Sequence, residues 1–200
     1  MSCSYERVLF LDIDGVLNSQ LFKCDRYNWI PYDACISQEE LTRRSAYHSS
    51  SERNLYVEER VKIDTDWHKL SWLDPESLIL LRDVVDKYDI AIVISSTWRG
   101  YYRDGDYGSF EKHNIIRFKR LFEKKIGWVD APVVGATKQL SGIRGHEIQE
   151  WLSRNIVKDF IILDDDSDMT PDQLSWHFYQ TNGSTGLTDH FSEWCKDRWN

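Results

Sequence analysis

The sequence predicts an α/β protein built on a parallel sheet that is flanked by helices. Short apolar segments rich in β-branched residues alternate along most of the chain with longer segments that keep a helical period. The short segments are apolar throughout, as expected for strands that are buried on both faces of a sheet. This alternation is typical of a doubly wound parallel sheet.

Five segments have the character of strands, and helices are expected between them. The predicted strands lie at 7–12, 89–94, 132–135, 159–163 and 177–180. Asp74 can cap the helix before the second strand, and Pro75 suits its first turn, after which apolar residues recur at helical spacing up to Tyr88. Further helices are expected at 110–126, 144–155 and 188–199.

Residues 19–72 interrupt this alternation. They mix polar and aromatic residues without a clear period of 2 or 3.6. Because a structureless loop of about 50 residues is uncommon in a compact domain, we expect a small cap or lid inserted after the first strand. The core would then comprise 1–18 and 73–200. The alternative is a partly mobile excursion of the chain.

Composition and charge limit the function classes. The formal net charge of -8 disfavours a dedicated nucleic-acid or membrane-surface binder. No apolar run approaches the length of a membrane span, no signal-peptide pattern is present, and the four cysteines lack paired metal-binding spacing. We therefore expect a cytoplasmic protein that contacts no membrane and forms no stable nucleic-acid complex. The sequence carries no signal of an oligomeric state.

Polar residues follow three of the predicted strands. The first strand ends in Asp12 and Asp14, a second ends in SSTWR (95–99), and a third ends in DDDSD (164–168). The carboxyl ends of parallel strands meet at one edge of a sheet. Carboxylates at such density repel one another, and Mg²⁺, which accepts carboxylate, water and phosphate oxygens, is the usual resolution. The pattern therefore predicts a Mg²⁺ site and a phosphorylated substrate.

These motifs also carry a family resemblance. In chain order they read DIDGVLN, ISSTWR, TKQLSGIRGHEIQEWL, IILDDDSDM and HFYQTNGSTGLTDHF. The set resembles the four motifs of the haloacid dehalogenase (HAD) superfamily over nearly the whole chain. It is similar in particular to a phosphatase-like branch whose domains are also found in bacterial RNA-repair proteins. The resemblance implies a Rossmann-like, HAD-like core.

The resemblance implies a role for each aspartate of the first motif. Asp12 would be the nucleophile that attacks phosphorus and forms an aspartyl phosphate. Asp14 would act first as general acid and then as general base, and its backbone carbonyl would bind the metal. Gly15 would let the backbone turn away from the site. Since the dehalogenases that attack carbon lack the second aspartate, the DID sequence favours phosphoryl transfer.

The other motifs would bind the phosphoryl group and the metal. Ser95, with Ser96 as the second candidate and Thr97 beside them, would hydrogen-bond the substrate. Arg144, at the start of a helix, would stabilise charge on the phosphoryl oxygens, and Lys138 is its rival for this role.

The metal ligands are expected to come from the first motif, DIDGVLN, and from the aspartate-rich motif IILDDDSDM. Mg²⁺ would be held by Asp12, by Asp14 and by Asp164 or Asp165, with Asp168 in support. Arg99 resembles an arginine that follows the second motif in polynucleotide 3'-phosphatases, although the spacing there is shorter, and we assign it to substrate binding.

The sequence therefore predicts a Mg²⁺-dependent phosphomonoester hydrolase. A nucleotide or the terminal phosphate of a nucleic acid is the favoured substrate, and a sugar or small-metabolite phosphate is the alternative. Two other readings remain open, namely a phosphate-binding regulatory module with poor turnover and a sugar-nucleotide transferase.

One basic segment stands out in this acidic chain. The helix predicted at 110–126 carries six lysines and arginines: Lys112, Arg117, Lys119, Arg120, Lys124 and Lys125. Charge runs of this kind usually form a solvated face. The segment is also the best candidate in the sequence for contact with a nucleic-acid backbone.

Overall fold

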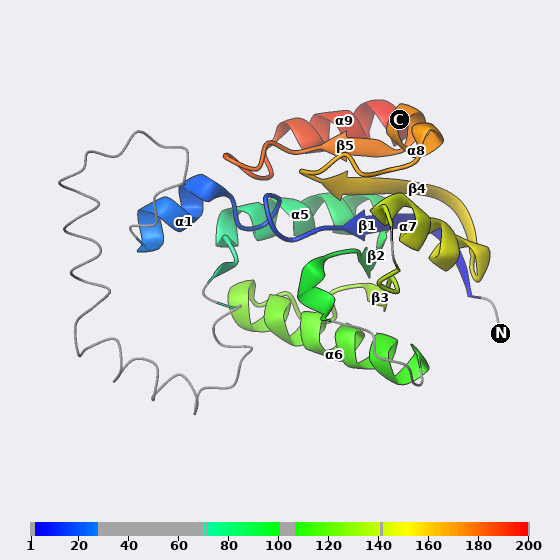
Figure 1. Ribbon diagram of the computed structural model, residues 1–200. Coiled ribbons are helices and arrows are strands. Elements are labelled where there is room, and N and C mark those ends of the chain that lie inside the picture. Colours follow the sequence, from blue (N-terminus) through cyan, green and yellow to red (C-terminus); the bar gives the residue numbers. More distant parts are fainter. Residues whose placement is uncertain (1–2, 28–69, 71, 101–106, 141, 200) are drawn as a thin grey trace.

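The computed structural model describes residues 3–27, 70, 72–100, 107–140 and 142–199. These residues form an α/β fold with one five-stranded sheet in the order β3-β2-β1-β4-β5 (Figure 1). Every neighbouring pair of strands is parallel. The predicted Rossmann-like fold class is therefore confirmed.

All five predicted strands are present. They are β1 (Ser4–Leu11), β2 (Ala91–Ile94), β3 (Val133–Ala136), β4 (Ile156–Asp164) and β5 (Phe178–Gln180). The strands β1 and β4 each begin three residues before their predicted start. Their first residues are partly or fully exposed, and they belong to the sheet because Ser4 pairs with Ile156. A criterion that looks for strands buried on both faces misses such strand starts.

The helices agree with the prediction in four cases. These are α5 (Pro75–Tyr88), α6 (Tyr107–Ile126), α7 (Arg144–Ser153) and α9 (His190–Trp199). As expected, Asp74 accepts a hydrogen bond from the backbone N–H of Glu76 at the start of α5. The helix α1 (Gln20–Tyr27), the short helix α8 (Pro171–Trp176) and the 3-10 turn η1 (Thr97–Arg99) were not predicted.

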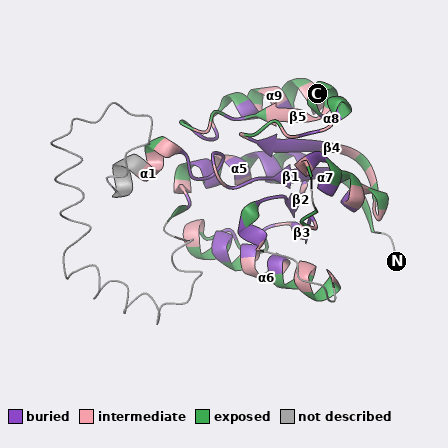
Figure 2. Ribbon diagram, viewed as in Figure 1, coloured by how far each residue is buried: buried purple, intermediate pink, exposed green. Residues whose placement is uncertain are grey.

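Helices cover both faces of the sheet, and β1 lies at its centre. Along β1, Leu9 and Leu11 pack into the larger hydrophobic cluster with α5, α6 and α9, whereas Val8 and Phe10 pack into the smaller cluster with α7. Figure 2 shows the buried central strands between these layers. The catalytic motifs are therefore attached to the most buried part of the fold.

The predicted cap, 19–72, lies almost entirely outside the described residues. The structure describes only its start, which includes α1, together with Leu70 and Trp72. The division into core and cap stays a prediction. Among the described residues, no helix has the length and apolar character that crossing a membrane would require.

Candidate active site

Three strand ends meet at one edge of the sheet, as the motif order predicts. Leu11 at the end of β1 pairs with Ile94 of β2 on one side and with Leu163 of β4 on the other. The backbone N–H of Asp12 donates to the carbonyl of Leu163 at 3.0 Å, and that of Ser95 donates to the carbonyl of Leu11 at 2.8 Å. The first, second and last motifs therefore lie side by side.

Three carboxylates gather at this edge. Asp12, Asp164 and Asp165 each place one oxygen so that the three oxygens lie within 4.8 Å of one another. Asp12 and Asp164 are buried, and Oδ2 of Asp164 is buried without any hydrogen-bond partner. A buried carboxylate oxygen without a partner is costly, and a hard cation would satisfy it. The residues present therefore fit a Mg²⁺ ion.

The carboxylates of this cluster are shifted toward the protonated form. Burial raises the pKa of Asp12 to about 6, although Arg144 and Ser96 act in the opposite direction. Burial, followed by the charge of Asp12, raises the pKa of Asp164 to about 8. Burial also raises the pKa of Asp165. Negative charge is thus in excess at this edge, which is the condition that favours binding of a cation.

Arg144 is the cation that contacts the cluster. Its Nη1 donates to Oδ1 of Asp12 at 2.6 Å and to the backbone carbonyl of Ser95, and it lies 3.2 Å from Oδ2 of Asp164. Burial lowers the pKa of Arg144, but the neighbouring carboxylates outweigh burial and the net pKa is raised. The guanidinium is therefore positively charged beside Asp12.

The first turn of α7 holds Arg144 in this position. Asp168, for which a supporting role behind the metal ligands is predicted, accepts the backbone N–H of Arg144 at 3.1 Å and lies 3.8 Å from its Nε. The rival residue, Lys138, donates to Glu150 at 2.7 Å and lies over the ring of Tyr107. Lys138 is thus engaged away from the carboxylates, and Arg144 is the residue that reaches Asp12.

Asp14 is held by three donors. Its Oδ2 accepts a hydrogen bond from Nε1 of Trp98 at 2.9 Å, and its Oδ1 accepts one from Nδ2 of Asn18 at 2.7 Å. Nζ of Lys23, on α1, lies 3.4 Å from the same Oδ1. The Asp14 side chain is about half exposed. This carboxylate is consequently fixed in direction yet open on one side, as a group that exchanges protons with substrate and water must be.

The residues of the second motif point in different directions. The hydroxyl of Ser95 accepts a 3.5 Å hydrogen bond from Thr137, whereas the hydroxyl of Ser96 acts to lower the pKa of Asp12 and caps η1 by accepting the backbone N–H of Trp98. Both serines are buried, and the side chain of Thr97 is exposed. Ser96, the second candidate, is therefore the serine that acts on Asp12 in this structure.

Arg99 is buried beside the site and is only partly satisfied. Its Nη2 donates to Oε2 of Glu147 at 2.5 Å, but its Nε and Nη1 have no hydrogen-bond partner. Burial lowers the pKa of Arg99, and the charge of Glu147 acts against this effect. The second oxygen of Glu147 accepts the backbone N–H of Leu140 at 2.8 Å. Glu147 therefore connects α7, the loop after β3, and the second motif.

The glycine of the first motif is required for contact with Asp165. Gly15 has a φ of +71°, a region that favours glycine. A Cβ there would lie 2.1 Å from Oδ2 of Asp165, and a Cβ on Gly183 would lie 2.5 Å from the same oxygen. The Asp165 carboxylate thus occupies a slot between two glycines that are far apart in the sequence.

Several residues of the site were missed from the sequence. They are Asn18, Lys23, Trp98, Thr137, Glu147 and Gly183. Five of them lie within the recognised motif stretches but had been given no role there: Asn18, Trp98, Thr137, Glu147 and Gly183. Lys23 lies outside these stretches. Glu147 lies three residues after Arg144 and so shares its helix face, a spacing that could also have been noticed.

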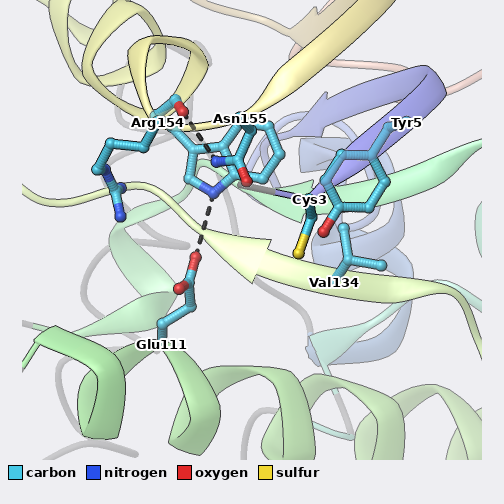
Figure 3. A pocket seen from close by; sticks show the side chains of 7 residues that line it. Cys3, Tyr5, Glu111, Val134, Arg154 and Asn155 are labelled. Atoms are coloured by element: carbon cyan, nitrogen blue, oxygen red, sulfur yellow. Dashed lines mark hydrogen bonds between the residues drawn. The ribbon is translucent and has the colours of Figure 1, made fainter. Parts of the chain in front are cut away.

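A separate pocket lies away from this cluster. It has a volume of about 470 Å³ and is formed near the start of β1 and the end of α7 (Figure 3). Its lining consists of Cys3, Tyr5, Glu111, Val134, Trp151, Arg154 and Asn155. Of these residues, Trp151 alone lies within a motif stretch, and we locate the active site at the aspartates on the basis of their chemistry.

Comparison with known proteins agrees with this geometry. Residues 8–190 match the profile of the family described as the HAD domain in Swiss Army Knife RNA repair proteins. No curated protein and no solved structure matched the chain. The family match supports phosphatase-type hydrolytic chemistry, for which HAD domains generally use Mg²⁺, and the three clustered aspartates could bind such a metal. The chain belongs to the family of HAD domains found in Swiss Army Knife RNA repair proteins.

Proposed function

We propose that the protein is a Mg²⁺-dependent phosphomonoester hydrolase that acts through an aspartyl-phosphate intermediate. The observation that carries this proposal is the set of groups around Asp12. Its buried carboxylate is bonded to Arg144 and lies within the three-aspartate cluster, and it is two residues from the exposed carboxylate of Asp14. A nucleophile, a cation for phosphoryl charge and a proton-transfer group are therefore within one site.

In the first step, an oxygen of Asp12 forms a bond to phosphorus as the bond from phosphorus to the leaving oxygen breaks. Asp14 gives its proton to that leaving oxygen. In the second step, Asp14 takes a proton from water, the water oxygen attacks phosphorus, and the Asp12 carboxylate is released with inorganic phosphate. Arg144 and a serine hydroxyl of the second motif stabilise the charge on the phosphoryl oxygens in both steps.

Mg²⁺ would be held by Asp12, Asp164 and Asp165, together with the backbone carbonyl of Asp14. When bound, it neutralises negative charge between the carboxylates and the phosphoryl group, which permits an anionic nucleophile to approach an anionic substrate. The orphaned Oδ2 of Asp164 supports this assignment.

The proposed substrate is a nucleotide or the terminal phosphate of a nucleic acid in the cytoplasm. The family description, which concerns RNA repair proteins, supports this class of substrate. Arg99, with two unsatisfied buried donor nitrogens next to the site, supports a role in binding an anionic substrate. Residues 19–72 would act as a cap that sets which substrates reach Asp12.

The test is hydrolysis of an aryl phosphate with and without Mg²⁺. We expect turnover that needs the metal and that falls by about 10⁴-fold or more in the Asp12→Asn variant. Beryllium fluoride with Mg²⁺ should inhibit the enzyme by forming an adduct on Asp12. Unchanged turnover in Asp12→Asn, or an adduct on another residue, would reject the nucleophile assignment.

A phosphate-release screen tests the substrate class separately. It compares nucleotides, oligoribonucleotides with a 3'- or 5'-phosphate, and sugar phosphates under the same conditions. We expect the nucleotides or oligonucleotides to have the highest kcat/KM. Activity confined to sugar phosphates would retain the mechanism but reject the proposed substrate.

A further inference from the structure

One helix of this acidic protein has a strongly basic surface. The helix α6 carries six lysines and arginines and two glutamates, a net charge of +4, whereas the whole chain carries -8. Successive residues of a helix are rotated by about 100°, so its cations can be placed around the helix axis. Five of these cations lie on or beside the side of α6 that is opposite its buried residues. We call these five residues the α6 basic face: Lys112, Arg117, Lys119, Arg120 and Lys124.

Three cations of the α6 basic face have no carboxylate partner in the described part of the chain. Lys112, Lys119 and Arg120 make no hydrogen bond or ion pair with any other residue in the described part of the chain. By contrast, Lys138 and Lys158 are each paired with a glutamate at 2.7 Å. Lys112, Lys119 and Arg120 therefore keep their attraction for an external anion.

The α6 basic face adjoins the candidate active site. Nη1 of Arg117 donates to the backbone carbonyl of Trp98 at 2.6 Å, and the indole of Trp98 donates to Asp14. At the end of the helix, Nζ of Lys125 lies 5.9 Å from the ring centroid of Phe22 on α1. The helix thus contacts the second motif near its middle and the start of the inserted segment near its end. A polyanion bound along α6 would pass close to Asp14.

We propose that the α6 basic face is the docking surface for the phosphate backbone of a single-stranded nucleic acid whose terminal phosphate enters the site. This inference rests on the proposed function and deepens it. From Lys112 to Lys124 the helix rises by about 18 Å, and phosphates along one stacked strand are roughly 3.4 Å apart. The face therefore matches about five nucleotides beyond the reacting end.

Charge and composition favour a nucleic acid over a folded protein as the partner. Ile116 is the large apolar side chain exposed on the described part of α6, and protein interfaces need a buried apolar or aromatic centre. The negative charge of the rest of the chain repels a polyanion elsewhere, which confines docking to α6 and keeps the complex weak and sensitive to salt.

The experiment measures binding and turnover of an oligoribonucleotide of roughly ten residues with a terminal phosphate, a length within the range of single-strand sites. Lys112, Lys119 and Arg120 are changed together to Gln, which preserves helix propensity, and the single variant Arg120→Gln is made in parallel. Binding is followed by fluorescence anisotropy at several salt concentrations in the Asp12→Asn background, so that the result does not depend on turnover.

The matched control removes the same charge elsewhere. Lys87, Lys158 and Lys196 are exposed, lie outside α6, and are changed together to Gln. This variant and the α6 variant have the same net charge. A difference between them therefore reports the position of the cations and not the total charge of the chain.

We expect the triple α6 variant to bind the oligonucleotide about 10-fold more weakly and the control to bind like the parent. The slope of log K against log salt should decrease by about 2 in the triple variant, because each phosphate neutralised in a single strand contributes about 0.7, and by about a third of that in Arg120→Gln. The KM for an aryl phosphate should not change in any of these variants.

Equal binding by the α6 variant and the control would overturn the docking surface, as would the absence of oligonucleotide binding by the parent protein. Failure of the proposed function has a different signature. In that case Asp12→Asn would leave aryl phosphate turnover unchanged, whatever the binding experiment showed.

Discussion

The strand β4 carries one aspartate near its start and another at its end, and the two residues are in opposite electrostatic situations. Asp159, near the start of the strand, accepts hydrogen bonds from Nη2 of Arg198 at 2.5 Å, Nε1 of Trp199 at 2.7 Å and the backbone of Phe160 at 2.9 Å. Burial raises the pKa of Asp159, but these donors outweigh burial and the net pKa is lowered. This carboxylate is stable as an ion.

Asp164, at the other end of the strand, has fewer donors, because its Oδ1 accepts the backbone N–H of Asp166 at 3.0 Å and no side chain donates a hydrogen bond to it in the described part of the chain. Its Oδ2 has no hydrogen bond, and its nearest cation, Arg144, is shared with Asp12. Its pKa is raised to about 8 by burial and by the charge of Asp12. The two arginine-aspartate contacts of β4 thus differ in role. The contact of Arg198 with Asp159 stabilises the fold, whereas that of Arg144 with Asp164 belongs to the proposed site for a cation and an anionic substrate.

The sharpest test of this comparison is the loss of charge at Asp164. We expect Asp164→Asn to lower Mg²⁺-dependent turnover by at least about 100-fold, because a metal ligand is lost. The metal-free variant should nevertheless be more stable, by about 1 kcal/mol or 2 to 4 °C in Tm, since a repelled carboxylate is removed. Turnover and thermal unfolding measure the two effects, and a lower Tm without metal would contradict the comparison.

A second variant tests whether Glu147 acts through Arg99. We expect Glu147→Gln to reduce kcat/KM by about 10-fold, mainly through KM, because Arg99 loses the carboxylate that orients it. In an Arg99→Ala background the same change should have almost no further effect on kcat/KM. Glu150→Gln, on the same helix, is the control for a general loss of charge. Additive effects of the Glu147 and Arg99 changes would show that Glu147 acts independently.

For Asp159, near the start of β4, we expect the opposite result, in which stability falls and turnover does not change. Asp159→Asn should leave turnover unchanged but destabilise the fold by about 1 kcal/mol at pH 7, a value reduced because the site is partly exposed. Since the folded pKa is lowered, the contribution of Asp159 is present above the ordinary aspartate pKa of about 3.9 and is lost as the pH falls through the folded value.

Urea unfolding of the parent and of Asp159→Asn across this pH range measures the contribution. The two proteins should become equal in stability at low pH. Asp86→Asn removes an exposed charge from α5 and serves as the control. A difference between parent and variant that is constant with pH would show that Asp159 stabilises the fold by packing and not by charge.

The smallest expected effect is the pH dependence of metal stabilisation. The pKa of Asp12 is raised to about 6 and that of Asp164 to about 8 in the folded protein. The contribution of these two groups to the stability of the metal-free protein is therefore complete below the ordinary aspartate pKa. It is lost as the pH rises through the two raised pKa values. Binding of Mg²⁺ requires ionised ligands. We therefore expect added Mg²⁺ to raise Tm by about 2 to 4 °C more at pH 8 than at pH 5.

Most of the sheet and the order of the motifs could be predicted from the sequence, because buried parallel strands and the polar residues after them have local signals. Arg144 and Asp12 are 132 positions apart, yet both were identified because each lies in a motif. The helix α8 was missed although Thr170 and Gln173 form a capping box and Pro171 opens the helix, and this local signal was available.

The remaining contacts have weak local signals or none. Glu147 looks like any polar residue of an amphipathic helix, and its contact with Arg99 depends on how α7 packs across the sheet. Gly183 lies in a polar turn, and its close approach to Asp165 follows from the strand order. The different contacts of Ser95 and Ser96 depend on the direction of each side chain, which the sequence of two adjacent serines does not contain, and the choice between them for substrate binding stays a prediction.

The central position of β1 has a consequence for the timing of synthesis. One of its two neighbours, β4, ends about 150 residues later in the chain. Because synthesis adds about 5 to 20 residues per second, the edge of β1 that pairs with β4 would stay unpaired for roughly 8 to 30 s. Asp12 and Asp164 would meet only then, so the aspartate cluster forms late in synthesis, whereas β1 can pair with β2 as soon as Ile94 has been added.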